Sequence, residues 1–200
     1  MNSPIDFIVQ PKEKRYNNTK QIDGTELVLN TSVEDHKFVS REAIVKATPL
    51  AFETNIKPGD GLIVHHNIFR RFYDVHGNEK NSKSYFKEDT YFCAIDQIFL
   101  HKQNKEWFAT PGFCFVAPIK KEDEGLISTD VEEPLKGIVK YTDNSGFVTK
   151  EQLVGFTPHS EYEFIIDGNR LYRVPLKSIS IHYDRKGNET EYHNSWLRSI

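Results

Sequence analysis

Short runs of β-branched and aromatic residues, bounded by Gly, Pro, Asn or Asp, recur along the whole chain and constrain its fold most. Such runs are typical of β-strands separated by turns. They are residues 7–9, 43–47, 61–65, 90–94, 98–100, 113–116, 137–141, 162–166, 169–174 and 178–181. Helix signals are sparse, because only 31–35 offers a cap and 122–133 has no apolar period of 3.6 residues. The sequence therefore predicts an all-β fold.

Three turn signals fit this fold class. Asp167-Gly168 lies between two strand-like runs, which predicts a tight hairpin. Two Gly-Asn turns, within 76–79 and 186–189, are expected at hairpin tips.

Composition limits the class of protein. The 200 residues are 38% hydrophobic, which is enough for the core of one medium domain or two small ones. A net charge of −3 gives no electrostatic reason to expect a nucleic acid or an anionic membrane as partner. No apolar run is long enough to span a bilayer, and the first residues lack the layout of a secretory signal. Two cysteines, Cys93 and Cys114, fit a reducing compartment. We therefore expect a soluble, cytoplasmic protein.

The two halves of the chain repeat the same order of motifs. Each half opens with a strand that ends at a proline, continues through a polar stretch with one apolar cluster, enters a second strand and closes with an apolar strand pair. The corresponding segments are 7–14 and 115–122, 27–29 and 126–127, 42–46 and 136–140, and 95–98 and 176–179. This internal repeat predicts two domains, residues 1–104 and 105–200.

The order of these motifs resembles the GroES-like co-chaperonin family. Residues 23–30 are similar to the mobile loop of that family, and 41–47 to the strand that follows it. Ile56–Val64 resembles its Gly-Asp turn and strand, and Ala94–Ile98 its closing strand. In the second half, the similar segments are the loop 123–128 and the strand 137–139.

The resemblance implies two tandem, partly open β-barrels with mobile loops, in a diverged version of the kind expected in phages. It further implies a homo-oligomeric ring that caps a GroEL-like chaperonin while that partner hydrolyses ATP. The residues expected to bind the chaperonin are Leu27, Val28 and Leu29, with Leu126 and Ile127 as a second set. A co-chaperonin carries no active site, so the chain is not expected to be an enzyme.

The chemistry of the first loop points the same way without the family name. Residues 12–40 are rich in Lys, Glu, Asn, Thr and Asp, which cannot bury enough apolar area to order themselves. An isolated Leu-Val-Leu at 27–29 suits docking into a partner's groove, and a ring of such loops multiplies weak binding. The alternative is that 27–29 forms a strand in the domain's own sheet.

Other residue clusters give no support for catalysis, a cofactor or a metal. His65 and His66 lie at the end of a predicted strand, where adjacent side chains point to opposite faces, so we do not expect them to share a metal. The carboxylates within 122–133 fit a solvated loop, and His159-Ser160 lacks a nucleophile elbow. The sequence contains no phosphate-binding glycine motif.

Two other functions remain open at this level. A structural protein of a virion could use the same barrels, and the polar excursion 70–86 and the aromatic C-terminal tail leave room for it. A barrel that binds oligonucleotides or sugars is disfavoured, because the charge balance is acidic and no stripe of basic and aromatic residues is present.

Overall fold

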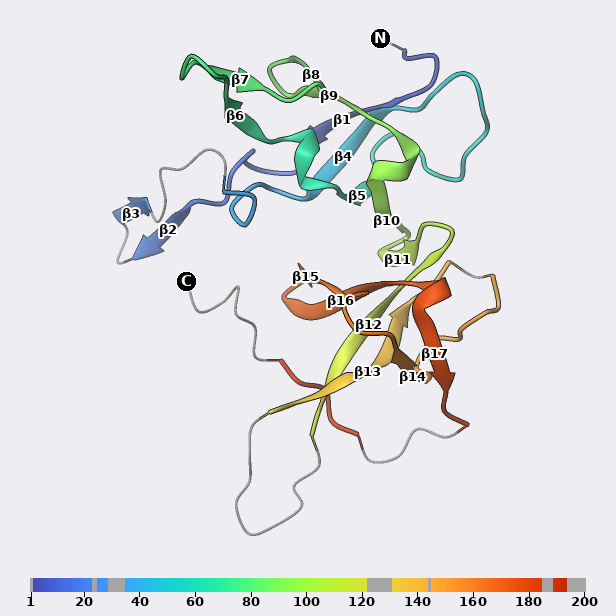
Figure 1. Ribbon diagram of the computed structural model, residues 1–200. Helices are drawn as coiled ribbons and strands as arrows, with labels where there is room; N and C mark the ends of the chain where they lie inside the picture. Colours follow the sequence, from blue (N-terminus) through green and yellow to red (C-terminus); the bar gives the residue numbers. More distant parts are fainter. Residues whose placement is uncertain are drawn as a thin grey trace. The chain divides into compact units, whose positions relative to one another are not determined.

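A computed structural model of the chain describes residues 2–22, 25–28, 35–121, 131–143, 145–184 and 189–193. Within these ranges the regular structure consists of β-strands and three short 3₁₀ turns (Figure 1). The fold class is all-β, which confirms the prediction from the recurring apolar runs.

The chain divides into two compact units, Met1–Trp107 and Phe108–Ile200. Unit 1 contains β1 (Phe7–Pro11), β2 (Thr19–Ile22), β3 (Thr25–Val28), β4 (Glu42–Ala47), β5 (Gly61–Val64), η1 (His66–Ile68), β6 (Arg71–Tyr73), β7 (Glu79–Asn81), β8 (Tyr85–Lys87), β9 (Thr90–Cys93), η2 (Ile95–Gln97) and β10 (Ile98–Gln103). Strand β11 (Glu106–Ala109) crosses the boundary. Unit 2 contains β12 (Phe113–Lys120), β13 (Glu132–Tyr141), β14 (Leu153–Phe156), β15 (Tyr162–Ile166), β16 (Asn169–Pro175), η3 (Leu176–Ser178) and β17 (Ile179–His182).

The large sheets of the two units share one strand order. Unit 1 has the order β8-β9-β1-β4-β5-β10, extended by β11, and unit 2 has β15-β16-β12-β13-β14-β17. Neighbouring strands within each set of six are antiparallel. A 3₁₀ turn precedes the last strand of each set, η2 before β10 and η3 before β17. The segments that correspond in sequence therefore occupy corresponding places in the two sheets.

Neither large sheet closes into a barrel within the described residues, since no pairing joins the two end strands of either sheet. The structure thus shows several antiparallel sheets, and it does not confirm the expected, partly open barrels. Central strands such as β12 and β14 are buried at successive positions and so face apolar surroundings on both sides. The core of unit 1 includes Phe7, Val9, Val45, Leu62, Val64, Phe69, Tyr91 and Cys93. The main core of unit 2 is formed by Cys114, Val116, Val139, Val148, Val154, Phe156, Val174 and Ile179.

Two of the predicted hairpins are present. Ile166 pairs with Asn169, and the two residues between them, Asp167 and Gly168, both have positive φ, of 47° and 81°. This is the backbone that a two-residue turn requires, and Asp-Gly adopts it easily. The excursion 70–86 contains the β6–β7 hairpin, which is a separate two-stranded sheet. The third predicted tip lies largely outside the described residues.

Gly137 occupies a position in β13 where the backbones pack closely. A Cβ atom there would lie 2.7 Å from the carbonyl oxygen of Ala117 and 3.0 Å from Cγ2 of Val116. We expect Gly137→Ala to lower the free energy of unfolding by about 1–3 kcal/mol through overpacking, measured by urea denaturation. The matched control is Gly61→Ala in β5, whose Cβ would meet side chains only at 3.6 Å and 3.8 Å. Equal losses in the two variants would contradict the steric explanation.

Candidate functional site

The chain leaves unit 1 at residues 15–16 and re-enters it at 38–40, and these two short stretches together are called the root. The residues between them, 17–37, carry β2 and β3 and are called the arm. Tyr16 and Val39 form an isolated antiparallel bridge, and the amide of Asn17 donates to the carbonyl of Phe38 at 2.7 Å. Tyr16, Phe38 and Val39 are buried in the core of unit 1. The sequence predicts that all of 12–40 lies outside the packed core. That prediction is wrong at both ends, because three apolar side chains of the root enter the core.

Arg15 fixes the outgoing side of the root. Its Nε donates to the carbonyl of Phe69 at 2.5 Å, its Nη1 to Oδ1 of Asn81 at 2.7 Å and its Nη2 to the carbonyl of Arg70 at 3.3 Å. Its own carbonyl accepts from the amide of Ser40 at 3.0 Å. The planar guanidinium thus joins the root to the segment that carries the β6–β7 hairpin.

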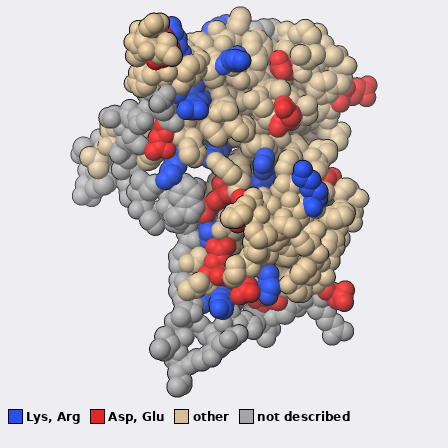
Figure 2. Space-filling view, in the orientation of Figure 1, with Lys and Arg blue, Asp and Glu red and all other residues tan. Residues whose placement is uncertain are grey.

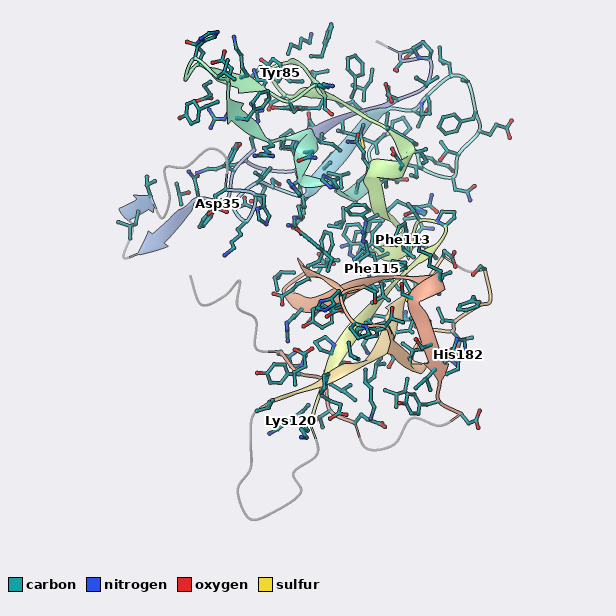
Figure 3. All side chains as sticks on the ribbon, viewed as in Figure 1. Asp35, Tyr85, Phe113, Phe115, Lys120 and His182 are labelled. Carbon is teal, nitrogen blue, oxygen red and sulfur yellow. The ribbon has the colours of Figure 1, made fainter. Side chains whose placement is uncertain are left out.

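Aromatic rings enclose the same root. The guanidinium carbon of Arg15 lies 5.4 Å from the ring centre of Tyr91 and 5.6 Å from that of Tyr85, which Figure 3 labels beside β8. The hydroxyl of Tyr16 accepts from the amide of Arg71 at 2.7 Å, and the Arg71 guanidinium lies 4.9 Å from the Tyr16 ring. Burial lowers the pKa of Arg15, but the group stays charged at any ordinary pH.

The described part of the arm beyond the root forms a hairpin. Strands β2 and β3 pair from Thr19 with Val28 to Ile22 with Thr25, and among the described residues they pair only with each other. Figure 1 shows this hairpin apart from the large sheet of unit 1. Leu27 is 50% exposed and Val28 is 54% exposed. Leu27 and Val28 therefore lie in a strand, as the alternative expects, but this strand belongs to a separate two-stranded sheet and not to the large sheet of unit 1.

The other predicted binding residues, Leu29, Leu126 and Ile127, lie outside the described residues. The ends of the second loop are described. The amide of Lys121 donates to the carbonyl of Val131 at 2.8 Å, and Lys120, labelled in Figure 3, pairs with Glu132. The second loop, like the first, therefore begins and ends at a paired root.

A buried arginine lies at this second root. Nε of Arg170 donates to Oε2 of Glu163 at 2.8 Å, and its Nη1 donates to Oε2 of Glu132 at 2.7 Å. The hydroxyl of Tyr172 accepts from Nη2 of Arg170 and donates to Oε2 of Glu132 at 3.1 Å. The guanidinium also lies 5.5 Å from the ring centre of Tyr192. The sequence predicts that Glu132 belongs to a solvated acidic run, but this residue begins β13 and holds Arg170.

Three histidine rings lie together where the arm returns to unit 1. The rings of His65 and His66 stack with centres 4.4 Å apart, and His36 lies 5.3 Å from His66. Figure 3 labels Asp35, the neighbour of His36, beside the returning chain. The sequence predicts opposite orientations for His65 and His66, and this is wrong because β5 ends at Val64. His65 instead caps η1, with its Nδ1 accepting from the amide of Asn67 at 3.1 Å.

The electrostatics of this cluster disfavour protonation. Burial is the main cause that lowers the pKa of His66, to about 4, and the nearby groups His65, Arg41, His36 and Arg70 lower it further. Within the described ranges no group of three or more His, Cys, Asp or Glu side chains is arranged to hold a metal ion.

Cys93 and Cys114 are buried and form no disulfide. Burial raises the pKa of both thiols, that of Cys114 to about 12. The Ser160 hydroxyl donates to the carbonyl of Thr157 at 2.6 Å. Lysines, arginines and carboxylates alternate over the face drawn in Figure 2, where the described residues form no continuous basic surface.

The chain matches no protein-family model, and no curated protein or solved structure is significantly similar to it. Within the described part of the chain, no helix has the length and apolar character needed to cross a membrane.

Proposed function

We propose that the protein is a co-chaperonin whose arm docks Leu27, Val28 and Leu29 into an apolar groove of a GroEL-like chaperonin ring. The observation that carries the proposal is a self-paired hairpin with two exposed apolar side chains on a buried, arginine-held root. In this proposal the protein acts in the cytoplasm, carries out no reaction itself and caps the ring while the chaperonin hydrolyses ATP.

The energetics of such an arm favour a ring. Leu27 and Val28 are each about half exposed, so full burial in a groove contributes roughly 1 kcal/mol per side chain. This gain is small beside the cost of association, and a single arm binds weakly. Several arms held in one oligomer bind together, because each contact raises the effective concentration of the next. A homo-oligomeric ring is therefore part of the proposal.

The repeated strand order supports the tandem form of the proposed GroES-like architecture. Both units connect the third and fourth strands of the shared order, β1 to β4 and β12 to β13, through a long loop with a paired root. We assign the loop 122–130, with Leu126 and Ile127, as a second docking segment of smaller apolar area.

The direct test is a pull-down of a GroEL-like chaperonin with the full chain, with ATP and without nucleotide. We expect the chaperonin to be retained only with ATP, in a stoichiometric complex visible by electron microscopy as a capped ring. Absence of binding with host chaperonins of several bacterial groups would overturn the proposal.

A second candidate is a structural protein of a virion. The observation that favours it is a group of exposed apolar side chains on the β6–β7 hairpin and β8, namely Phe72, Tyr73, Val75 and Phe86. Mass spectrometry of purified virions separates the two functions, because a co-chaperonin acts in the infected cell and is absent from the particle.

A further inference from the structure

We propose that the rings of His36, His65 and His66 form a pH-sensitive latch on the returning side of the arm, closed when neutral and opened by protonation. The latch concerns the root of the arm in the free protein. Only its consequence for docking rests on the proposed function.

The geometry sets the two sides of the latch. His36 belongs to the returning chain, whereas His65 and His66 belong to the cap and first residue of η1. His66 lies between the other two rings, 4.4 Å from one and 5.3 Å from the other. In the closed arm the His36 ring therefore lies against the His66 imidazole, with the two ring planes tilted by 41°.

The charged groups around His66 oppose a proton there. Besides the two neighbouring imidazoles, the guanidinium groups of Arg41 and Arg70 act on it, from the chain before β4 and from the chain after η1. The Nδ1 of His65 already accepts from the amide of Asn67, so protonation at that atom would break the cap of η1. The neighbouring guanidinium groups and the hydrogen bond accepted by His65 therefore favour the neutral form of the imidazoles.

The direction of the pH effect follows from linkage. The pKa of His66 is about 4 in the closed state and rises toward its ordinary value of 6.5 once the returning chain lifts away. The open state binds more protons, so closure has its full stability above pH 6.5 and loses it as the pH falls toward 4. Between pH 7.5 and 5.0 the opening constant should rise severalfold, with about thirtyfold as the upper bound set by a full return to 6.5.

The two sides of the root should respond differently. The outgoing side is held by Arg15, which keeps its charge and its three donated hydrogen bonds throughout this pH range. Acid should therefore release the returning side while the outgoing side stays attached, which would alter how the arm presents Leu27 and Val28.

Hydrogen exchange of the free full-length protein tests the latch. Protection of the Asn17 and Phe38 amides, whose acceptors lie in the returning chain, is measured at pH 7.5 and pH 5.0 relative to intrinsic rates. We expect it to fall severalfold, and by at most about thirtyfold, in the natural protein, while amides between β12 and β16 change little. In His66→Phe, which keeps a ring but cannot titrate, the change should be less than twofold.

Two results would overturn the proposal: unchanged protection of Asn17 at pH 5.0 in the natural protein, or full pH dependence in His66→Phe. The variant His36→Phe keeps a ring beside His66 and should retain most of the pH dependence of protection.

An NMR titration of His66 in the natural protein gives a test that needs no variant, because a folded-state pKa near 6.5 would exclude the latch. None of these measurements uses a chaperonin, so failure of the latch and failure of the co-chaperonin proposal are distinguishable.

Discussion

Replacing Leu27 and Val28 together by serine is expected to abolish capture of a GroEL-like chaperonin in the presence of ATP. The two side chains are about half exposed on β3. Burial of this exposed apolar area in a groove contributes roughly 2 kcal/mol per arm to the free energy of binding. The arms of a ring bind as one assembly, so the losses of binding free energy from all arms add and the binding constant falls by the product of the single effects. Binding should fall below detection at micromolar protein in the pull-down described above.

The same double variant should fold like the parent. Strand β3 pairs only with β2 among the described residues, and the core of unit 1 is formed by other side chains. The matched control is Leu50→Ser, which removes a leucine that is 69% exposed but lies outside the arm. It should bind the chaperonin normally. If Leu50→Ser abolishes binding equally, or if the arm variant loses several degrees of melting temperature, docking through the arm is wrong.

Much of the fold could be predicted because strands and tight turns are local properties of the sequence. The Asp167-Gly168 turn and the buried runs of β1, β5 and β12 were identified from residue type alone. Strand β14, Leu153–Phe156, is not among the strands that the sequence predicts. Its four residues are all buried, and its place between β13 and β17 depends on partners far away in the sequence.

The sequence indicates the apolar tip of the arm as a candidate site, which stays a prediction, and it gives no sign of the root. An apolar triplet in a polar segment is visible in the sequence, but the partners of Arg15 lie 54 to 66 positions further along the chain. Only the tertiary arrangement brings Phe69 and Asn81 to that guanidinium. The histidine cluster was missed for a related reason, since the end of β5 at Val64 decides where the next two rings point.

At each of the two roots an arginine packs against aromatic rings, and this similarity is not visible when the sequences of the two halves are compared. In unit 1, Arg15 holds the root of the arm and lies against the rings of Tyr85 and Tyr91. In unit 2, Arg170 holds the root of the second loop and lies against Tyr172 and Tyr192. Arg15 lies in the chain between β1 and β2, whereas Arg170 lies in β16, so the two are not copies of one residue. Both units nevertheless fix a long loop by a charged group enclosed in aromatic rings.

Arg170→Met is expected to cause the largest loss of stability in unit 2. The side chains of Arg170 and Glu163 are only 6% and 4% exposed, so removal of the guanidinium leaves a carboxylate without its charged partner in the interior. Breaking one side of such a pair costs about 3–5 kcal/mol, because the desolvated charge is no longer compensated. Urea denaturation followed by circular dichroism measures the loss.

Two further variants separate this explanation from a simple loss of packing. Arg170→Met combined with Glu163→Leu removes both charges, and it should recover most of the stability, since an apolar pair of similar volume replaces a buried ion pair at little cost. Lys12→Met breaks an ion pair with Glu42 whose side chains are 47% and 37% exposed, and it should cost about 1 kcal/mol or less. If the double variant is as unstable as Arg170→Met alone, the buried Glu163 carboxylate that has lost Arg170 is not the cause of the instability. The loss would then lie in the contacts of Arg170 with Glu132 and Tyr172, which neither variant restores.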